Sequence, residues 1–235
     1  MIELYGMASP NVTKVSLMLE ETGLEHRFHW VRVFREEQFS PEFLKLNPNH
    51  KVPVLVDGDG PGGQSVTLFE SGAILIYLAD KTGCLLPALE TAGRYEVLKW
   101  LMIQLTGFGP MCGQYVHFSR FAPAGNDYAR ERYFNEVHRL YRVLDRRLAE
   151  SEYLGGPEYS IADISMFPWA ALHEYQGLSW DAVPHVTRWF EQIQSRPAVI
   201  AVMKQLEALM HKDAETVETA SAGNLDRFLG RNLPV

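Results

Sequence analysis

The sequence is poor in cysteine and has no long apolar run. Its 235 residues include only two cysteines, Cys84 and Cys112, which are too few for a disulfide framework and typical of a reducing compartment. A transmembrane helix needs about 20 consecutive apolar residues, and the strand-like start Met1–Tyr5 lacks the basic segment of a signal peptide. We therefore expect a cytoplasmic protein without a membrane partner.

Positive charge and metal-binding patterns are also scarce. Lysine and arginine total 22 against 29 aspartates and glutamates, which gives a formal net charge of −7. This balance disfavours nucleic acid as a partner, although a local site can still bind an anion. The eight histidines are scattered, and none has a cysteine or second histidine at metal-ligand spacing on the same face. We expect no nucleic-acid partner and no metal.

Strand-like and helix-like patterns alternate over residues 1–83, whereas later residues show helix-like patterns only. This order predicts an α/β domain followed by an all-α domain. We place the first at residues 1–84, the second at 91–212 after a short linker, and a C-terminal extension at 213–235. The expected strands are Ile2–Gly6, Phe28–Val33, Val52–Val56 and Val66–Phe69, and the expected helices are Val12–Thr22, a short one at Pro41, Ser71–Lys81, Arg94–Gln104, Tyr128–Ala149, Ile161–Tyr175 and Val186–Gln194.

The segment Asn49–Leu55 places a proline where a strand is expected to begin. Pro53 has no N–H to donate to a sheet. If the bond between Val52 and Pro53 is cis, Val52 presents its own N–H and C=O outward, where an extended peptide could pair with them as an added strand. A trans proline that opens an edge strand is the alternative, because only about 5–6% of X–Pro bonds are cis.

The segment Leu68–Ile74 ends a strand with an acid and a hydroxyl and then begins an apolar helix. We expect Ser71 at the N-cap, where free amides and the helix dipole favour a carboxylate. Glu70 beside it could bind an ammonium group, so the pair suits an α-amino acid. Plain helix capping next to a solvated glutamate is the alternative.

Ser9-Pro10-Asn11 precedes the first expected helix. A thiol bound here would lie near a helix N-terminus and near hydroxyl and amide donors, which can lower a thiol pKa from about 8.5 to roughly 3.5–7.5. The thiolate would then be the nucleophile. A turn with a capping asparagine is the alternative.

These three segments resemble the thioredoxin-like domain of glutathione transferases. Tyr159–Ile164 resembles the capping box of that family's helical domain, in which Ser160 caps the helix and Asp163 reaches back to a free amide. The resemblance covers roughly residues 1–210. Within the family the chain is most similar to the nu class, on the basis of Asn11 after Ser9-Pro10, Gln38-Phe39 before Pro41-Glu42-Phe43, Gly109-Pro110-Met111 before Gly113-Gln114, and the segment Tyr128–Tyr133.

The resemblance implies a glutathione transferase fold, with a thioredoxin-like domain before an all-helical one, and a homodimer. It implies glutathione, reduced or as its disulfide, as co-substrate and a small electrophile or disulfide as partner. Ser9 and Asn11 would be the catalytic residues that stabilise the glutathione thiolate. Glutathione would be bound by Gln38, Lys51, Val52, Pro53, Glu70, Ser71 and Arg132, the last from the neighbouring subunit, and the second substrate would lie between the domains against Tyr115, His117, Phe118, Trp169 and Tyr175.

The chain departs from the family pattern at several positions. The nu class usually has threonine where Ser9 stands, although serine keeps the hydroxyl. No cysteine stands at the start of the first helix, and we interpret Tyr5 as structural. We interpret Cys112 as a buried packing residue, and Cys84 at a helix end is a weaker candidate for catalysis.

The expected function is disulfide reduction by glutathione, transfer of glutathione to an electrophile, or both. A glutathione-dependent lyase that cleaves aryl ethers and a non-catalytic regulatory module are alternatives, since a fold does not fix a function. The polar stretch 214–223 predicts a flexible strap, and Leu225, Phe228 and Leu229 have helical spacing. The end of the chain would dock over the pocket or the partner subunit, or fray.

Overall fold

The computed structural model describes residues 1–231, and the chain forms two compact units. The first unit joins residues 1–78 to the residues from 197 onward, and the second comprises residues 79–196. Within the described part of the chain, no helix combines the length and apolar character of a membrane span. Nor does that part contain three or more His, Cys, Asp or Glu side chains grouped to hold a metal ion.

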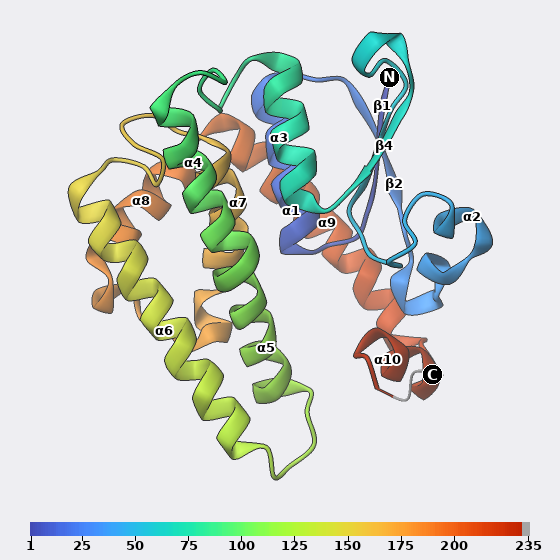
Figure 1. Cartoon of the computed structure of the whole chain (residues 1–235). Helices are drawn as coiled ribbons and strands as arrows, with labels where there is room; N and C mark the ends of the chain where they lie inside the picture. Colours follow the sequence, from blue (N-terminus) through green and yellow to red (C-terminus); the bar gives the residue numbers. More distant parts are fainter. Residues whose placement is uncertain (232–235) are drawn as a thin grey trace. The chain divides into compact units, whose positions relative to one another are not determined.

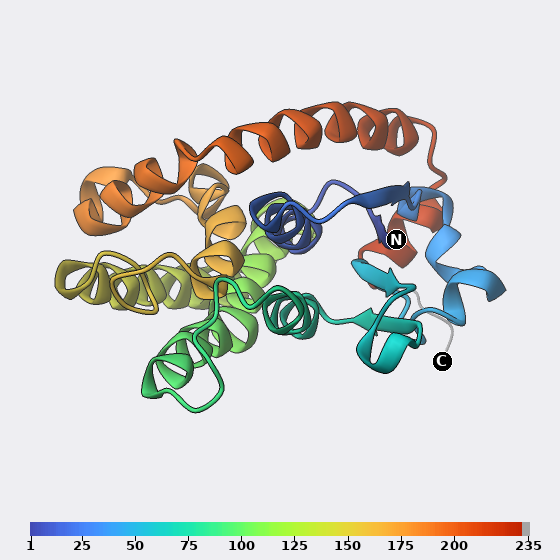
Figure 2. The same ribbon diagram turned by 90° about the horizontal axis from the view of Figure 1, so that it is seen from above.

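The first unit contains a four-stranded mixed sheet with the strand order β2-β1-β3-β4. Strand β1 pairs in parallel with β2 and antiparallel with β3, which pairs antiparallel with β4. Figures 1 and 2 show α1 and α3 on one side of this sheet and the short α2 on the other. The bounds are β1 Ile2–Gly6, α1 Pro10–Thr22, β2 His26–Trp30, α2 Pro41–Leu44, β3 Val54–Asp57, β4 Val66–Phe69 and α3 Ser71–Thr82.

Alternation of buried and exposed side chains explains the central strand and its following helix. Ile2, Leu4 and Gly6 of β1 are buried while the residues between them are half-buried, as the two-residue period of a strand requires. Helix α1 begins after Ser9, whose side chain accepts the N–H of Val12, and stops at Gly23 with a left-handed φ of 64°. These caps confirm the predicted helix and its glycine stop.

Two helices from the end of the chain belong to the first unit. Helix α9 (Pro197–Glu218) packs against α1, and Figure 2 shows it passing beside that helix; α10 (Ala222–Phe228) contacts the 3-10 turn η1 (Val33–Arg35). The predicted strap over 214–223 is therefore wrong for residues 214–218. They continue α9 because the stretch contains alanine and glutamate and no glycine or proline before Gly223.

The boundaries of the two compact units differ from the domain boundaries predicted from the sequence pattern. Helix α9 lies within the predicted helical domain, 91–212, over most of its length, but it packs with the first unit. The predicted extension, 213–235, contains the end of α9 and α10; its last four residues lie outside the described part. The predicted domain boundaries remain a prediction.

The second unit is built from helices, which confirms the predicted all-α character. A π-helical turn, η4 (Gln104–Phe108), joins α4 to α5, and two 3-10 turns, η5 (His173–Gln176) and η6 (Trp180–Ala182), join α7 to α8. The helix predicted over Ile161–Tyr175 is shorter than expected. The helices are α4 Ala92–Ile103, α5 Gly109–Arg120, α6 Asp127–Glu150, α7 Ile161–Ala170 and α8 Pro184–Gln194.

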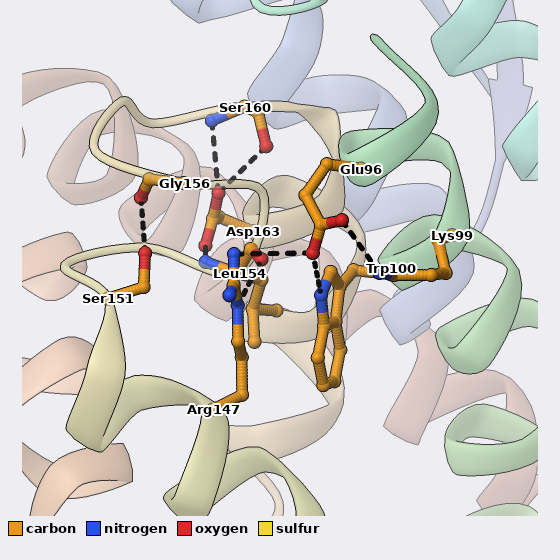
Figure 3. A network of polar contacts seen from close by, with 9 residues as sticks. All are labelled: Glu96, Lys99, Trp100, Arg147, Ser151, Leu154, Gly156, Ser160 and Asp163. Carbon is orange, nitrogen blue, oxygen red and sulfur yellow. Dashed lines mark hydrogen bonds and ion pairs between the residues drawn. The ribbon is translucent and has the colours of Figure 1, made fainter. Parts of the chain in front are cut away.

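The predicted capping box of α7 is present around a fully buried carboxylate (Figure 3). Asp163 accepts the N–H of Ser160 at 3.0 Å and its hydroxyl at 2.9 Å through Oδ2. Through Oδ1 it accepts the N–H of Leu154 and the indole N–H of Trp189, each at 2.9 Å. Burial raises the pKa of Asp163, and these hydrogen bonds oppose that shift. One carboxylate thus fixes the start of α7, the preceding loop and α8.

Candidate functional site

A cavity of about 490 Å³ lies in the first unit, where the loop after β1, the loop before β3 and the end of the chain meet. Five residues predicted from the sequence line it: Ser9, Asn11, Gln38, Lys51 and Val52. They come from three separate segments of the chain. Their convergence on one space makes this cavity the candidate site.

Ser9 lies at the N-terminus of α1 and has two roles in the geometry. Its Oγ accepts the N–H of Val12 at 3.4 Å, and its backbone carbonyl accepts the N–H of Thr13 at 2.9 Å. A hydroxyl both accepts and donates, so capping leaves the Ser9 O–H proton able to point into the cavity. Asn11 lies in the first turn of the same helix, where the helix dipole favours a negative charge.

Val52 offers an unpaired stretch of backbone. The Val52–Pro53 peptide bond is cis, which is the first of the two alternatives left open by the sequence. Neither the N–H nor the C=O of Val52 has a backbone partner among residues 1–231, and β3 begins only at Val54. The buried side chain of Asn47 supports this loop, donating to the carbonyl of Lys51 at 2.7 Å and accepting the N–H of Asn49 at 2.9 Å.

Gln38 places a buried polar atom in the cavity wall. The residue is 5% exposed, and its Oε1 has no hydrogen-bond partner among the described residues. It belongs to the 3-10 turn η2 (Glu37–Phe39). A buried carbonyl oxygen without a partner is costly and uncommon. This atom is therefore suited to accept an N–H from a ligand.

Glu70 and Ser71 do not line the cavity, but sheet pairing places them beside it. Strands β3 and β4 pair Val54 with Phe69 in antiparallel register, so the residues that precede Val54 run next to those that follow Phe69. The prediction that Ser71 is the N-cap is wrong by one residue. Helix α3 begins at Ser71, and the carbonyl of Glu70, whose φ is 70°, accepts the N–H of Ile74 at 3.0 Å.

Lys14 is a functional candidate that the sequence analysis missed. It is 1% exposed, and its Nζ donates to Oγ of Ser71 at 3.4 Å. Burial lowers the pKa of Lys14 to about 7, and the charge of Glu70 opposes that shift. The available signal was its place among the apolar residues of α1, between Val12 and Val15. A buried ammonium group behind Ser71 adds positive potential where a carboxylate was expected.

The remaining predicted site residues lie in the second unit. Arg132 is exposed on α6 and lines a hollow of about 650 Å³ together with Arg139 and Arg142. Tyr115 and Phe118 of α5 have ring contacts to α6, at centroid distances of 5.6 and 5.5 Å. The substrate wall thus remains a prediction, with Tyr115, His117 and Phe118 on α5, Trp169 on α7 and Tyr175 on η5.

The structure agrees with the packing interpretation of Tyr5 and Cys112. The ring of Tyr5 stacks on His29 with centroids 4.5 Å apart, and its hydroxyl donates to Glu3 at 3.1 Å. Cys112 is fully buried, and burial raises the pKa of its thiol well above the ordinary value, so the reactive thiolate is suppressed. Cys84 is exposed and lies outside the described cavity.

Comparisons with known proteins identify the family of the chain. A family model described as the N-terminal domain of glutathione S-transferase matches residues 8–81, and one described as its C-terminal domain matches residues 95–197. The disulfide-bond oxidoreductase YfcG of Escherichia coli is 48% identical over 199 residues, 84% of this chain and 92% of that protein.

Solved structures give the same result. A glutathione transferase family member from Pseudomonas fluorescens, solved with two glutathione bound, is 47% identical with a TM-score of 0.81, over 86% of this chain and 91% of that one. A glutathione transferase from Pseudomonas putida, solved with one glutathione disulfide per subunit, is 44% identical with a TM-score of 0.80, over 86% and 90%. The chain therefore belongs to the glutathione S-transferase family.

Proposed function

We propose that this chain is a glutathione-dependent enzyme that reduces disulfide bonds. The observation that carries the proposal is the cavity of the first unit, which gathers Ser9, Asn11, Gln38, Lys51 and Val52 around one space. Glutathione is an extended tripeptide with two carboxylates, an ammonium group and a thiol, which these residues and the start of α3 complement. The relatives support the proposal, because one is a disulfide-bond oxidoreductase and two were solved with glutathione or its disulfide.

In the proposed complex, the middle residue of glutathione pairs with the N–H and C=O of Val52 as a short added strand. Ser71 and the amides at the start of α3 bind the γ-glutamyl carboxylate, and Glu70 binds the adjacent ammonium group. Lys51 binds the glycyl carboxylate through a charge-assisted contact. The buried carbonyl of Gln38 accepts an amide N–H of the tripeptide.

The glutathione thiol lies at Ser9 and Asn11, whose donors and helix N-terminus stabilise the thiolate. The thiolate attacks one sulfur of the substrate disulfide, so that a mixed disulfide forms, the substrate S–S bond breaks and the first substrate thiolate leaves. A second glutathione thiolate attacks the glutathione sulfur of the mixed disulfide. Glutathione disulfide forms and the second substrate thiolate leaves, so two electrons pass from two glutathiones to the substrate.

We propose a homodimer in which Arg132 reaches the ligand of the neighbouring subunit, with the aromatic residues of α5, α7 and η5 against the second substrate. The hollow around Arg132 supports this, because its three arginines outnumber Glu131 and Glu136 in the lining, although Glu136 pairs with Arg139 at 2.6 Å. Sedimentation analysis is expected to show a dimer, and a monomer across the working concentration range would contradict this part.

Transfer of glutathione to an electrophilic carbon would use the same thiolate. The carbon–sulfur bond would then form as the leaving group departs, and no second glutathione would be needed. Product analysis with a small disulfide, a haloaromatic compound and an aryl ether separates reduction, conjugation and ether cleavage. Reduction is expected to be the fastest of the three.

Replacing Asn11 tests the proposed thiolate site. Asn11→Ala is expected to lower turnover of a small disulfide by about 10² to 10³ and to change glutathione affinity only a few-fold, because the lost donor acts on the thiolate. Steady-state kinetics and direct binding measurements check the two effects, with the half-buried Asn126→Ala on the second unit as control. Equal turnover in wild type and Asn11→Ala would remove this residue from the mechanism.

A further inference from the structure

The end of the chain is fastened to the first unit. Helix α10 begins with a capping box, in which Oγ of Ser221 accepts the N–H of Asn224 at 3.1 Å and the Asn224 side chain accepts the N–H of Ser221 at 3.0 Å. Leu225 packs against the buried core cluster that contains Phe34. The ring of Phe228 lies 4.5 Å from the ring of Phe34. The interpretation of a frayed terminus is therefore wrong for residues 222–228.

Further anchors hold the segment that leads to α10. The buried carboxylate of Asp213 accepts the N–H of Ala8 at 2.7 Å and the indole N–H of Trp30 at 2.8 Å. The guanidinium of Arg35 donates to the hydroxyl of Thr219. The end of the chain is thus bonded to the loop after β1, which carries the candidate catalytic serine, and to the segment that follows β2.

Two side chains of α10 line the same cavity as the predicted glutathione residues. Arg227 and Phe228 belong to its wall together with Ser9 and Lys51. Phe228 keeps 38% of its surface exposed, although one side of its ring rests on Phe34. The docked tail therefore contributes an aromatic ring and a cation to the cavity.

Neighbouring side chains position the guanidinium of Arg227. Its Nη1 donates to Oε2 of Glu36 at 3.1 Å, and its Cζ lies 5.8 Å from the ring centroid of Phe39. Figure 1 shows the dark red α10 next to the blue segment that carries Glu36 and Phe39. A guanidinium has five N–H donors in a planar fork. The bond to Glu36 leaves donors with which Arg227 can bind a carboxylate.

Lys51 and Arg227 together give the cavity two cationic side chains, which Glu36 compensates only in part. A lysine binds a carboxylate as a point charge, whereas an arginine can bind both oxygens. Lys51 and the η2 turn with Gln38 lie toward the glycyl end of the proposed ligand, and Arg227 lies over the Phe39 ring of that turn. The cation of the tail therefore lies where the glycyl carboxylate is expected.

We propose that Arg227 determines specificity for the free glycyl carboxylate of glutathione, which it binds together with Lys51, and that docked α10 completes the site. The inference rests on the proposed function, because it names the part of the tripeptide that the tail recognises. A ligand whose glycyl end is esterified leaves both cations without a negative partner. The docked tail thus favours glutathione over neutral-ended analogues.

Calorimetry with glutathione and its glycyl monoethyl ester tests the inference on the full chain. Arg227→Gln is expected to weaken glutathione binding about tenfold and ester binding less than about twofold, since only the free carboxylate loses a partner. Arg227→Lys is expected to retain part of the preference, because it keeps the charge without the fork. Arg231→Gln is the matched control: it removes the same charge from the tail at a residue outside the cavity lining, and both affinities should stay unchanged.

A truncation after Lys212 supplies an independent variant, since it removes α10 and the Asp213 anchor together. It is expected to lose the preference for the free carboxylate as Arg227→Gln does. An unchanged preference in either variant, or an equal loss for both ligands in Arg227→Gln, would overturn this inference and leave the proposed function intact. No binding of either compound to the wild type would overturn both.

Discussion

The ammonium group of Lys14 lies inside the first unit, with Nζ 3.4 Å from the hydroxyl of Ser71. Burial lowers the pKa of Lys14 from 10.5 to about 7, against the opposing charge of Glu70. At neutral pH the group is therefore close to its own titration, and its charged form is costly to bury. Burying a charged lysine in this position lowers the stability of the fold. The same positive charge behind Ser71 favours the binding of an anionic ligand.

This pKa shift predicts a pH dependence of stability. Between about pH 7 and pH 10.5 the unfolded chain holds a proton on Lys14 that the folded chain has lost. Unfolding then takes up a proton, so this residue makes the free energy of unfolding rise by up to about 1.4 kcal/mol per pH unit across that window. Below the folded pKa both states are protonated and the contribution is flat.

Lys14→Met removes this contribution. We expect the variant to be more stable than the wild type near neutral pH, and its advantage to shrink as the pH rises. Urea unfolding of both proteins from about pH 6 to about pH 9 measures the difference, and the exposed Lys45→Met controls for the loss of a lysine. A difference between wild type and Lys14→Met that is constant with pH would contradict the assignment.

Single residues of the site could be predicted where a local pattern carries them. Ser9 follows a strand and precedes a helix, and a proline marks Val52, so the cavity contains both as expected. The sequence predicts Ser71 as the N-cap of α3, whereas Ser71 is the first residue of the helix. The difference arises because Glu70 adopts a left-handed conformation that its residue type does not predict. Lys14 was missed because a lysine on an apolar helix face is normally taken for a solvated side chain.

At the scale of elements, the Asp163 carboxylate joins three parts of the second unit. Figure 3 shows it between Ser160, at the start of α7, and Leu154, in the loop before that helix. The indole of Trp189 brings in α8. In the same view Glu96 accepts hydrogen bonds from Lys99 and Trp100. The buried carboxylate has four donors for its two oxygens, so among residues 1–231 its charge is compensated by hydrogen bonds and not by an ion pair.

Asp163→Asn is expected to destabilise the protein by about 3 kcal/mol. An amide keeps one acceptor oxygen and turns two N–H groups toward the donors that the other carboxylate oxygen had satisfied. Urea unfolding measures the loss, with the exposed Asp181→Asn as the matched control. A loss equal to that of the control would show that the hydrogen bonds to this carboxylate contribute little.

Most strands and several helices follow from hydrophobic period and turn residues, but two helices were not predicted. Helix α5 starts at Gly109-Pro110 after a π-helical turn, and these residues are typical of a break between elements. Proline is nevertheless tolerated in a first helical turn. Helix α9 (Pro197–Glu218) buries polar side chains, Asp213 and Thr216, as well as Val199 and Val202, and it packs against α1. Tertiary packing decides both cases.

At the scale of the whole molecule, the return of the chain to its first unit is the feature that no local pattern could predict. Asp213 bonds to Ala8 across 205 residues. Sequence periodicity shows that α10 can be a helix with an apolar side, but not which surface that side covers. An α/β domain followed by a helical one was predictable from element order, whereas the pairing of the strands was not, and the family resemblance supplied the site. The contribution of Arg227 to the cavity became visible only in the structure.

The proposed reaction uses a sulfur that glutathione brings and that no cysteine of the chain supplies. The most direct test is glutathione-dependent reduction of a small disulfide by the double variant Cys84→Ser/Cys112→Ala, compared with the wild type. We expect turnover within about twofold of the wild type, because Cys112 is buried with a suppressed thiolate and Cys84 lies outside the cavity. Loss of disulfide reduction in the folded double variant would contradict the account.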